Sequence, residues 1–269
     1  MKMNSQDEMR FFLQDFHIHA TAHRIASSDN MATTDREMKV EKIVKKSLEL
    51  GFKRIGIIEH LEPITGRHPW KECLRVKEEV NKFKDIKGIS VYSGCEVSII
   101  NLEGSLSASS EEVKKAGFDF LIASVHGMPK KVENIPEYHR VALTMMLNAI
   151  KSQPFITILG HPWRDTPKTL KRIGAIGQWD YSQIPSEDIV KIVDGTKKQN
   201  VALEITMDLV AKAEYLKFLK IVHQYGARFS LGSDAHSMES LKNSLVTIKA
   251  LKKIGIESHS LWLPDKKRI

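Results

Sequence analysis

Short, continuously apolar runs alternate with longer amphipathic stretches along the chain. Seven of the short runs are rich in Val, Ile, Leu and Phe and show no polar alternation, which is typical of parallel strands covered on both faces. The runs predicted as strands are residues 12–16, 54–58, 90–96, 118–125, 155–159, 201–205 and 228–232.

The stretches between those runs repeat their apolar positions with a helical period. Thr34 and Glu37 have the spacing of a capping box, and Gly51 provides a stop for the helix that they begin. The predicted helices are residues 34–50, 71–83, 110–116, 137–151, 186–199, 209–225 and 239–253, and residues 164–183 are the least regular stretch. Because no linker or repeat interrupts the series, we expect one α/β domain over residues 1–269, closed as a barrel.

Residues with chemical function gather at the C-terminal ends of the predicted strands, where α/β barrels carry their active sites. Six of the 11 histidines lie there, and a seventh, His23, lies in the first loop. Random placement would scatter them over helices and surface. The residues at the strand ends are His17, His19, His60, Glu96, His126, His161, Asp234 and His236.

The spacing of these residues suits metal binding. His17 and His19 are two residues apart, as are Asp234 and His236, so each pair projects from one face of a regular strand. Imidazole and carboxylate are ligands for zinc, manganese and iron alike. One zinc ion takes three or four protein ligands, so eight or nine candidates indicate two or three divalent ions.

The composition of the chain limits which kinds of metal site and binding partner are expected. The two cysteines, Cys73 and Cys95, are far apart, which argues against a disulfide framework and a thiolate zinc site. The net charge of +8 favours anionic partners, but no basic run interleaves with aromatic residues, so nucleic acid is not favoured. The N-terminal residues lack a signal-peptide pattern and no apolar run is long enough for a membrane span, so we expect a cytoplasmic protein. Nothing indicates an oligomeric state.

The ordered series of HxH, a histidine after the second strand, GxE, SVH, GHP and GSDxH resembles the PHP superfamily, named for polymerase and histidinol phosphatase. The resemblance runs from Asp15 to about Ser240. It implies a distorted (β/α)7 barrel, TIM-like in outline, with a trinuclear metal site. Residues 94–97, 122–126 and 201–205 look most like stand-alone bacterial phosphoesterases and the PHP domains of bacterial family X polymerases.

The resemblance also implies a division of the ligands. His17, His19, Glu96 and Asp234 would hold one ion, Glu96 would bridge to a second held by His126 and His161, and His60 and His236 would hold a third. Family members complete the third site with a His or Asp five or six residues after HxH. Here Arg24 and Ile25 occupy those positions, and we assign the role to His23.

These features predict a metal-dependent hydrolase that cleaves a phosphorylated small molecule, a phosphate monoester, by a metal-activated water. Glu96, Asp234 and His236 are the candidate catalytic residues, and Arg164, Arg24 and Lys130 are candidates to bind the phosphate. A phosphodiesterase or nuclease is the alternative, with histidinol-phosphate phosphatase below it. A non-catalytic metal-stabilised scaffold is disfavoured by the retained ligands. An amidohydrolase is disfavoured because that superfamily wants a bridging lysine and an eighth strand.

The sequence leaves the roles of three further carboxylates undecided. Asp15 and Glu59 flank ligands, and each could orient an imidazole or be an ordinary strand-end residue. Glu204, inside a predicted strand, could be paired with a lysine or arginine of the barrel.

Overall fold

Seven parallel strands follow one another around the centre of the molecule, each paired with the next in sequence. The computed structural model describes residues 13–21, 35–64, 69–164, 171 and 179–264. The strands form a nearly closed barrel, which confirms the predicted distorted (β/α)7 architecture. They are β1 (Gln14–His19), β2 (Arg54–Ile58), β3 (Ser90–Ser98), β4 (Phe120–Ser124), β5 (Ile158–Leu159), β6 (Ala202–Thr206) and β7 (Phe229–Gly232).

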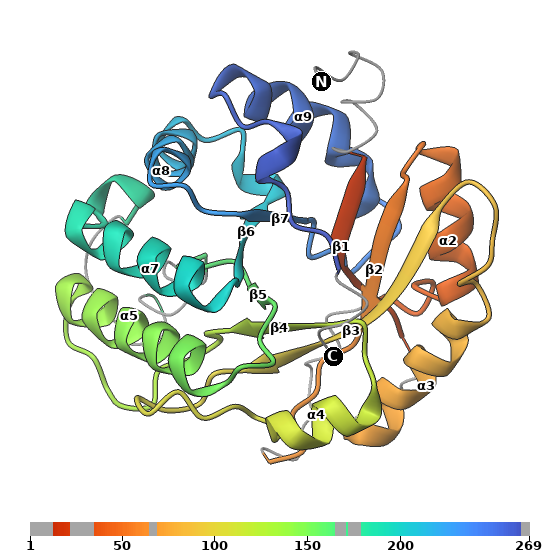
Figure 1. Cartoon of the computed structure of the whole chain (residues 1–269), viewed down its shortest axis with the longest axis horizontal. Coiled ribbons are helices and arrows are strands. Elements are labelled where there is room, and N and C mark those ends of the chain that lie inside the picture. The colour runs from red at the N-terminus through yellow and green to blue at the C-terminus, as the bar shows by residue number, and fades with distance from the viewer. Residues whose placement is uncertain (1–12, 22–34, 65–68, 165–170, 172–178, 265–269) are drawn as a thin grey trace.

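Helices surround the strands on the outside (Figure 1). Within the described residues, the α-helices are α2 (Val40–Glu49), α3 (Trp70–Asn81), α4 (Ser110–Ala116), α5 (Ile135–Ser152), α7 (Ser186–Gln199), α8 (Ala213–Gln224) and α9 (Ser244–Lys253). Four short 3₁₀ helices are described as well: η1 (Tyr181–Gln183), η2 (Met207–Leu209), η3 (Ser240–Asn243) and η4 (Ser258–Ser260). None of the helices in the described ranges is both long enough and apolar enough to cross a membrane.

The barrel is closed between β1 and β7 by few backbone contacts. His19 N–H donates to the carbonyl of Ala235 at 3.0 Å, and Ala235 N–H donates to the carbonyl of His17 at 3.3 Å. The bridge between Ile18 and Ala235 is an isolated one, whereas the other neighbouring strands share two or more paired positions. The HxH motif on β1 and the DxH motif that follows β7 therefore meet at the seam of the barrel.

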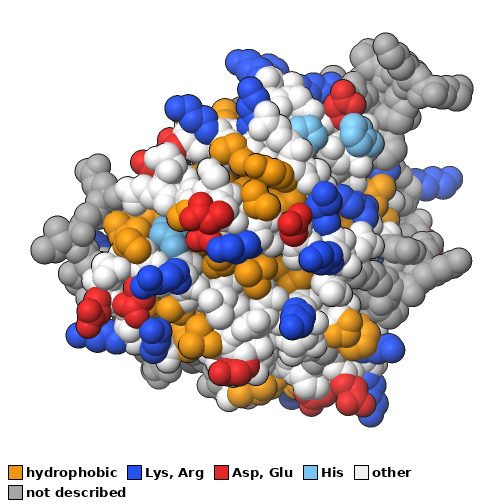
Figure 2. All heavy atoms as spheres, turned by 60° about the vertical axis from the view of Figure 1, so that its left-hand side comes forward, with side chains coloured by type: hydrophobic (Ala, Val, Ile, Leu, Met, Phe, Trp, Pro, Cys, Tyr) orange, Lys and Arg blue, Asp and Glu red, His pale blue; other side chains and the backbone are white. Residues whose placement is uncertain are grey.

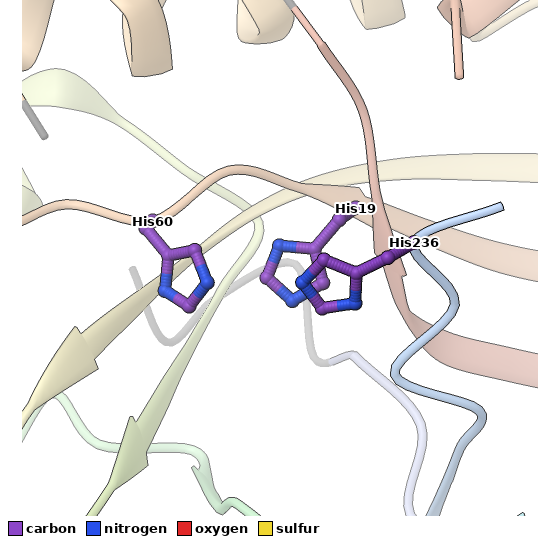
Figure 3. A group of neighbouring side chains, drawn as sticks. All are labelled: His19, His60 and His236. Atoms are coloured by element: carbon purple, nitrogen blue, oxygen red, sulfur yellow. The ribbon is translucent and has the colours of Figure 1, made fainter. Parts of the chain in front are cut away.

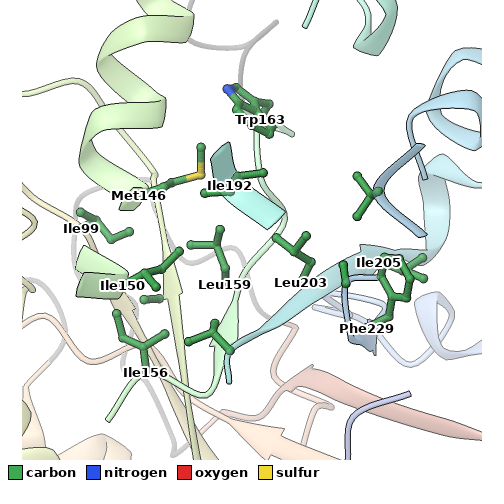
Figure 4. Packing of buried hydrophobic residues seen from close by; sticks show 14 of the residues in the cluster. Ile99, Met146, Ile150, Ile156, Leu159, Trp163, Ile192, Leu203, Ile205 and Phe229 are labelled. Atoms are coloured by element: carbon green, nitrogen blue, oxygen red, sulfur yellow. The ribbon is translucent and has the colours of Figure 1, made fainter. Parts of the chain in front are cut away.

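Most of the hydrophobic core lies between the strands and the outer helices. Figure 4 shows part of it, where Met146 and Ile150 of α5 and Ile192 of α7 lie beside Leu159, with Leu203 of the next strand further along the same cluster. Each such side chain contributes about 1.5–3 kcal/mol when it is fully buried. The apolar spacing that predicts the helices is therefore the spacing that fills this layer.

A smaller cluster includes Phe16, Phe120 and Trp262, whose rings meet edge to face with centroids 5.2–6.1 Å apart. Phe16 belongs to this cluster, but Ile18, two residues later, packs with the core that contains residues of α2. A register shift between Asp15 and Ile18 interrupts the regular alternation of β1. The regular strand assumed for His17 and His19 is thus bulged beside them.

Several predicted boundaries are wrong. The helix predicted over residues 34–50 is α2, which begins at Val40, because Asp35 Oδ1 accepts the Glu37 N–H in a turn and the N-cap is Lys39. A capping box forms instead at Ser109 and Glu112 of α4. The fifth strand shrinks to two residues, and α8 and α9 begin four and five residues later than predicted, each after a 3₁₀ helix.

Basic side chains do not form one continuous patch on the face that carries α5 and α7. Figure 2 shows them spaced among acidic and apolar side chains on that face. Lys191 is paired with Asp188 at 2.9 Å, which illustrates this mixing.

Candidate metal centre

Eight predicted ligands converge at the C-terminal ends of the strands. His17 and His19 lie on β1 and Glu96 on β3, and the others follow their strands within four residues. Every one of the eight lies in at least one group of three whose ligand atoms are within 4.8 Å of one another. The four groups are His19–His60–His236, His17–His19–Asp234, His17–Glu96–His161 and His60–Glu96–His126.

Four donor atoms of this cluster face one another at nearly equal distances. His17 Nε2 lies 3.1 Å from His19 Nε2, and Asp234 Oδ1 lies 3.3 and 3.0 Å from these two nitrogens. Glu96 Oε2 lies 3.5 Å from both nitrogens. Donors placed tetrahedrally around a zinc ion are separated by about 3.3–3.5 Å, given zinc–ligand bonds of about 2.0–2.1 Å. The cage therefore has the size that a small divalent cation requires.

The carboxylate of Glu96 joins this cage to a second set of donors. Its Oε1 lies 3.2 Å from His126 Nε2 and 3.1 Å from His161 Nε2, and it accepts the Ser124 hydroxyl at 2.6 Å. Its Oε2, fully buried, accepts no hydrogen bond from the described residues, although His60 Nδ1 lies 3.1 Å away. A buried, unpaired carboxylate oxygen among histidine nitrogens fits a bridging metal ligand.

Three histidine rings make up a third group, drawn in Figure 3. The rings of His19 and His236 stack with centroids 4.0 Å apart, and His60 lies beside them with its ring 4.5 Å from that of His19. His236 Nδ1 lies 2.8 Å from the Asp234 carbonyl oxygen, so Nδ1 carries the proton that it donates there. The Nε2 lone pair of His236 is then left for a cation.

Charges within the cluster are strongly interdependent. Burial would raise the pKa of Glu96, but His126, His17 and His60 outweigh it and hold this pKa well below its usual range. Burial likewise works against the ionised form of Asp234, yet His17 and His19 hold its pKa low. The carboxylates are therefore anionic at neutral pH.

The two histidines of β1 respond in opposite directions. Burial lowers the pKa of His17, but Glu204, Glu96 and Asp234 outweigh burial and raise it well above its usual value. Burial lowers the pKa of His19 to about 4. Their Nε2 atoms are 3.1 Å apart, so the pair can share one proton but cannot both be charged. One cation between them would satisfy both lone pairs.

Polar groups behind the ligands fix their orientation. Glu204 Oε2 accepts from His17 Nδ1 at 2.7 Å, which the sequence leaves open. Ser98 Oγ accepts from His126 Nδ1 at 2.9 Å, and neither Ser98 nor its partner Glu62 is among the predicted site residues. The signal in the sequence for Glu204 is a single charged residue within an apolar strand.

The other two flanking carboxylates bind the backbone. Asp15 Oδ1 accepts from the N–H of His17 at 3.1 Å and of Ser233 at 3.0 Å, so it joins β1 to the segment after β7. Glu59 accepts from the His60 N–H at 2.9 Å. Both carboxylates stabilise the main chain that carries ligands.

Two of the candidate ligands have backbone conformations that are unusual for non-glycine residues. His161 has φ of 25° and Asp234 has φ of 52°, and Trp163, next to Pro162, has φ of 61°. Such conformations cost on the order of 1–3 kcal/mol and concentrate at functional sites. Their occurrence at two ligands supports a functional reason for the local geometry.

The predicted phosphate-binding residues differ in their positions and contacts. The Arg164 guanidinium is paired with Asp234 Oδ2 and lies 3.3 Å from Asp208 Oδ2, so it borders the cage. Lys130 is half exposed and paired with Glu137 at 2.8 Å. Arg24 and the predicted ligand His23 lie outside the described residues.

Comparison with known proteins places these features in a family. A family model described as "PHP domain" matches residues 27–208, which is well over half of the chain. The chain belongs to the PHP domain family. This agrees with the resemblance seen in the motif series.

Curated relatives and a solved structure extend the comparison. A probable phosphatase of Caldicellulosiruptor saccharolyticus is 28% identical over 85% of this chain and 84% of its own length. A probable phosphatase of Clostridium novyi is 25% identical, covering 84% of this chain and 83% of its own length. The crystal structure of histidinol phosphate phosphatase from Lactococcus lactis, complexed with zinc, L-histidinol and phosphate, matches with a TM-score of 0.63 and 20% identity. It covers 90% of this chain and 94% of that one. At that identity the likeness concerns the fold of this PHP domain protein.

Proposed function

We propose that this PHP domain protein is a metal-dependent phosphoesterase that hydrolyses phosphate monoesters. The observation that carries the proposal is the shared position of Glu96, whose two carboxylate oxygens face different sets of histidine nitrogens at 3.1–3.5 Å. A carboxylate in this position would hold two divalent cations, one on each oxygen. The probable phosphatases among its relatives support the same reaction class.

We propose that the candidate ligands hold two or three divalent ions. His17, His19, Asp234 and Glu96 would hold one, and Glu96, His126 and His161 a second. His60 and His236 would hold a third, with His23 proposed to complete it. Zinc, manganese and iron all suit these donors. When bound, adjacent divalent ions activate a water molecule and neutralise charge on the phosphoryl oxygens.

The chain's own groups would prepare the reaction. Glu96 and Asp234 supply anionic oxygens, which lower the net charge of the filled centre and fix its geometry. Arg164, at the edge of the cage, is positioned to exchange its contact with Asp208 for two oxygens of a phosphate. Arg24 and Lys130 remain proposed phosphate ligands. The substrate class is a phosphorylated small molecule.

The test is phosphate release from a panel of monoesters, including nucleotides and histidinol phosphate. Chelated protein would be assayed after zinc, manganese or iron is restored. We expect turnover that requires metal and falls at least 100-fold in His126→Ala and Asp234→Asn. His259→Ala is the matched control, since His259 is 74% exposed and pairs only with Glu257 among the described contacts of its ring.

Other outcomes are equally informative. Full activity in folded His126→Ala and Asp234→Asn would show that the assigned centre is wrong. Metal-dependent hydrolysis of a phosphodiester or of DNA, with no monoester cleaved, would replace the proposal by the nuclease reading.

A further inference from the structure

A buried carboxylate that is outside the predicted ligand set contacts a predicted ligand directly. Glu204, on β6, places Oε2 2.7 Å from Nδ1 of His17 on β1. Each side chain is only 1% exposed. The contact therefore spans from β6 to β1 behind the metal cage, in a region that water does not reach.

The space for this contact depends on a glycine. A Cβ atom added to Gly232, on β7 between the two strands, would lie 2.7 Å from Glu204 Cδ and 2.8 Å from Cβ of His17. Real Cβ atoms do not approach other atoms so closely. Gly232 therefore leaves room for the Glu204–His17 pair, and this gives the glycine of the GSD motif a steric reason.

The contact decides which nitrogen of His17 bears the proton. A carboxylate accepts hydrogen bonds and does not donate when ionised, so Nδ1 of His17 must be the donor. In neutral imidazole the lone pair is then on Nε2. That atom is the one that lies 3.1 Å from His19 Nε2 and 3.3 Å from Asp234 Oδ1.

We propose that Glu204 is a positioning residue of the metal centre, which holds His17 in the tautomer and ring orientation needed to present Nε2 to a cation. The inference rests on the metal binding in the proposed function and assigns a role to a residue outside its ligand set. A full negative charge beside the remote nitrogen also makes Nε2 a stronger donor.

The role differs from that of the other supports in the cluster. His126 is held through the neutral hydroxyl of Ser98, and His236 through the backbone carbonyl of Asp234. Glu204 contributes charge as well as direction. Glu204→Gln keeps an oxygen acceptor and removes the charge, while Glu204→Ala removes both.

The experiment measures the affinity for Zn²⁺ by competition with a chromophoric chelator, on metal-free protein. We expect affinity to fall by about 10- to 100-fold in Glu204→Ala and by less in Glu204→Gln, because outer partners of metal-ligating histidines have effects of that size. Thr206→Val is the matched control, since Thr206 is also fully buried on β6 and its Oγ1 has no hydrogen-bond partner among the described residues. Its affinity should equal that of the wild type.

A second measurement covers variants that fail to fold. In the zinc-loaded wild type with ¹⁵N-labelled histidine, we expect His17 to carry its proton on Nδ1, with the downfield shift of a proton bonded to a carboxylate. A protonated Nε2 on His17 would overturn the inference.

The outcomes separate this inference from the proposed function. Equal Zn²⁺ affinities in wild type, Glu204→Gln and Glu204→Ala, with the wild type binding Zn²⁺, would overturn the role of Glu204 alone. A wild type that binds no Zn²⁺, Mn²⁺ or Fe²⁺ would overturn the metal centre and this inference with it.

Discussion

The hydroxyl oxygen of Ser98 lies 2.9 Å from Nδ1 of His126, on the opposite side of the ring from the nitrogen that faces Glu96. Ser98 in turn donates its hydroxyl proton to Glu62, which is also buried. The hydroxyl can therefore accept the Nδ1 proton of His126 while its own proton is held elsewhere. These two hydrogen bonds leave the lone pair of His126 on Nε2, the nitrogen that faces Oε1 of Glu96.

Replacing Ser98 should weaken the second metal site more than the first. We expect Ser98→Ala to lower the Zn²⁺ affinity of the site that contains His126 by about tenfold, because His126 loses the acceptor that fixes its tautomer. Titration calorimetry of metal-free protein would resolve the two binding steps. Ser152→Ala is the control, since the exposed Ser152 hydroxyl bonds only to the Asn148 carbonyl of its own helix among the described contacts. An unchanged isotherm for Ser98→Ala would contradict the role of this hydroxyl.

Arg164 should contribute to phosphate binding. We expect Arg164→Ala to raise the inhibition constant of inorganic phosphate by about tenfold or more, because hydrogen bonds to charged groups contribute about 1.5–3 kcal/mol. Steady-state inhibition would measure it, with the exposed Arg140→Ala as control. Because Arg164 also contacts Asp234, Zn²⁺ affinity must be measured alongside. Unchanged inhibition by phosphate would assign Arg164 to support of Asp234 only.

Metal removal should lower the thermal stability. Ligands come from both sides of the barrel seam, so an ion binds the folded state in preference to the unfolded chain. At a free Zn²⁺ concentration of 100 times Kd, linkage gives about 2.7 kcal/mol, or a rise in Tm of roughly 5–10 °C. Differential scanning fluorimetry of chelated and Zn²⁺-restored protein would measure this rise. Asp234→Asn should lose most of it, and an equal rise in that variant would speak against the cage.

A glycine on β3 should be essential for packing around Phe120. A Cβ atom at Gly94 would overlap the ring of Phe120, and one at Gly56 would do the same. We expect Gly94→Ala to destabilise the protein by about 1–3 kcal/mol in urea unfolding, as overpacked cores do. In a Phe120→Ala background the added methyl group has space, so the cost of Gly94→Ala should shrink. Equal costs in the two backgrounds would exclude this clash as the cause.

The order of strands could be predicted because each apolar run is continuous and bounded, and parallel strands are buried on both faces. Element ends were harder to predict, since the same four-residue pattern gives different results. Glu37 lies in a turn before α2, which begins only at Val40, whereas Ser109 and Glu112 form a capping box at the start of α4. The difference lies in competing local contacts, such as the turn that Asp35 makes with Glu37.

The convergence of the eight candidate ligands could be predicted because the C-terminal ends of parallel strands meet at one end of a barrel, whatever the loop lengths. The groups behind them could not. His17 and Glu204 are 187 positions apart, and Arg164 and Asp234 are 70 apart. Which carboxylate meets which ring depends on packing across the barrel, for example on the space beside Gly232, and no local pattern encodes it.

The sparse backbone pairing between β1 and β7 has a consequence for local motion. Among the described residues, two main-chain hydrogen bonds join the strands there, together with the contact of Asp15 with Ser233 and the hydrogen bond from the Ser233 hydroxyl to the His17 carbonyl. Parting the strands therefore breaks few hydrogen bonds. The amides of this seam would then exchange with solvent through small opening events and not through global unfolding. The proposed coordination by His17, His19 and Asp234 would span the same seam, so the occupancy of the metal cage would set how often the barrel wall opens.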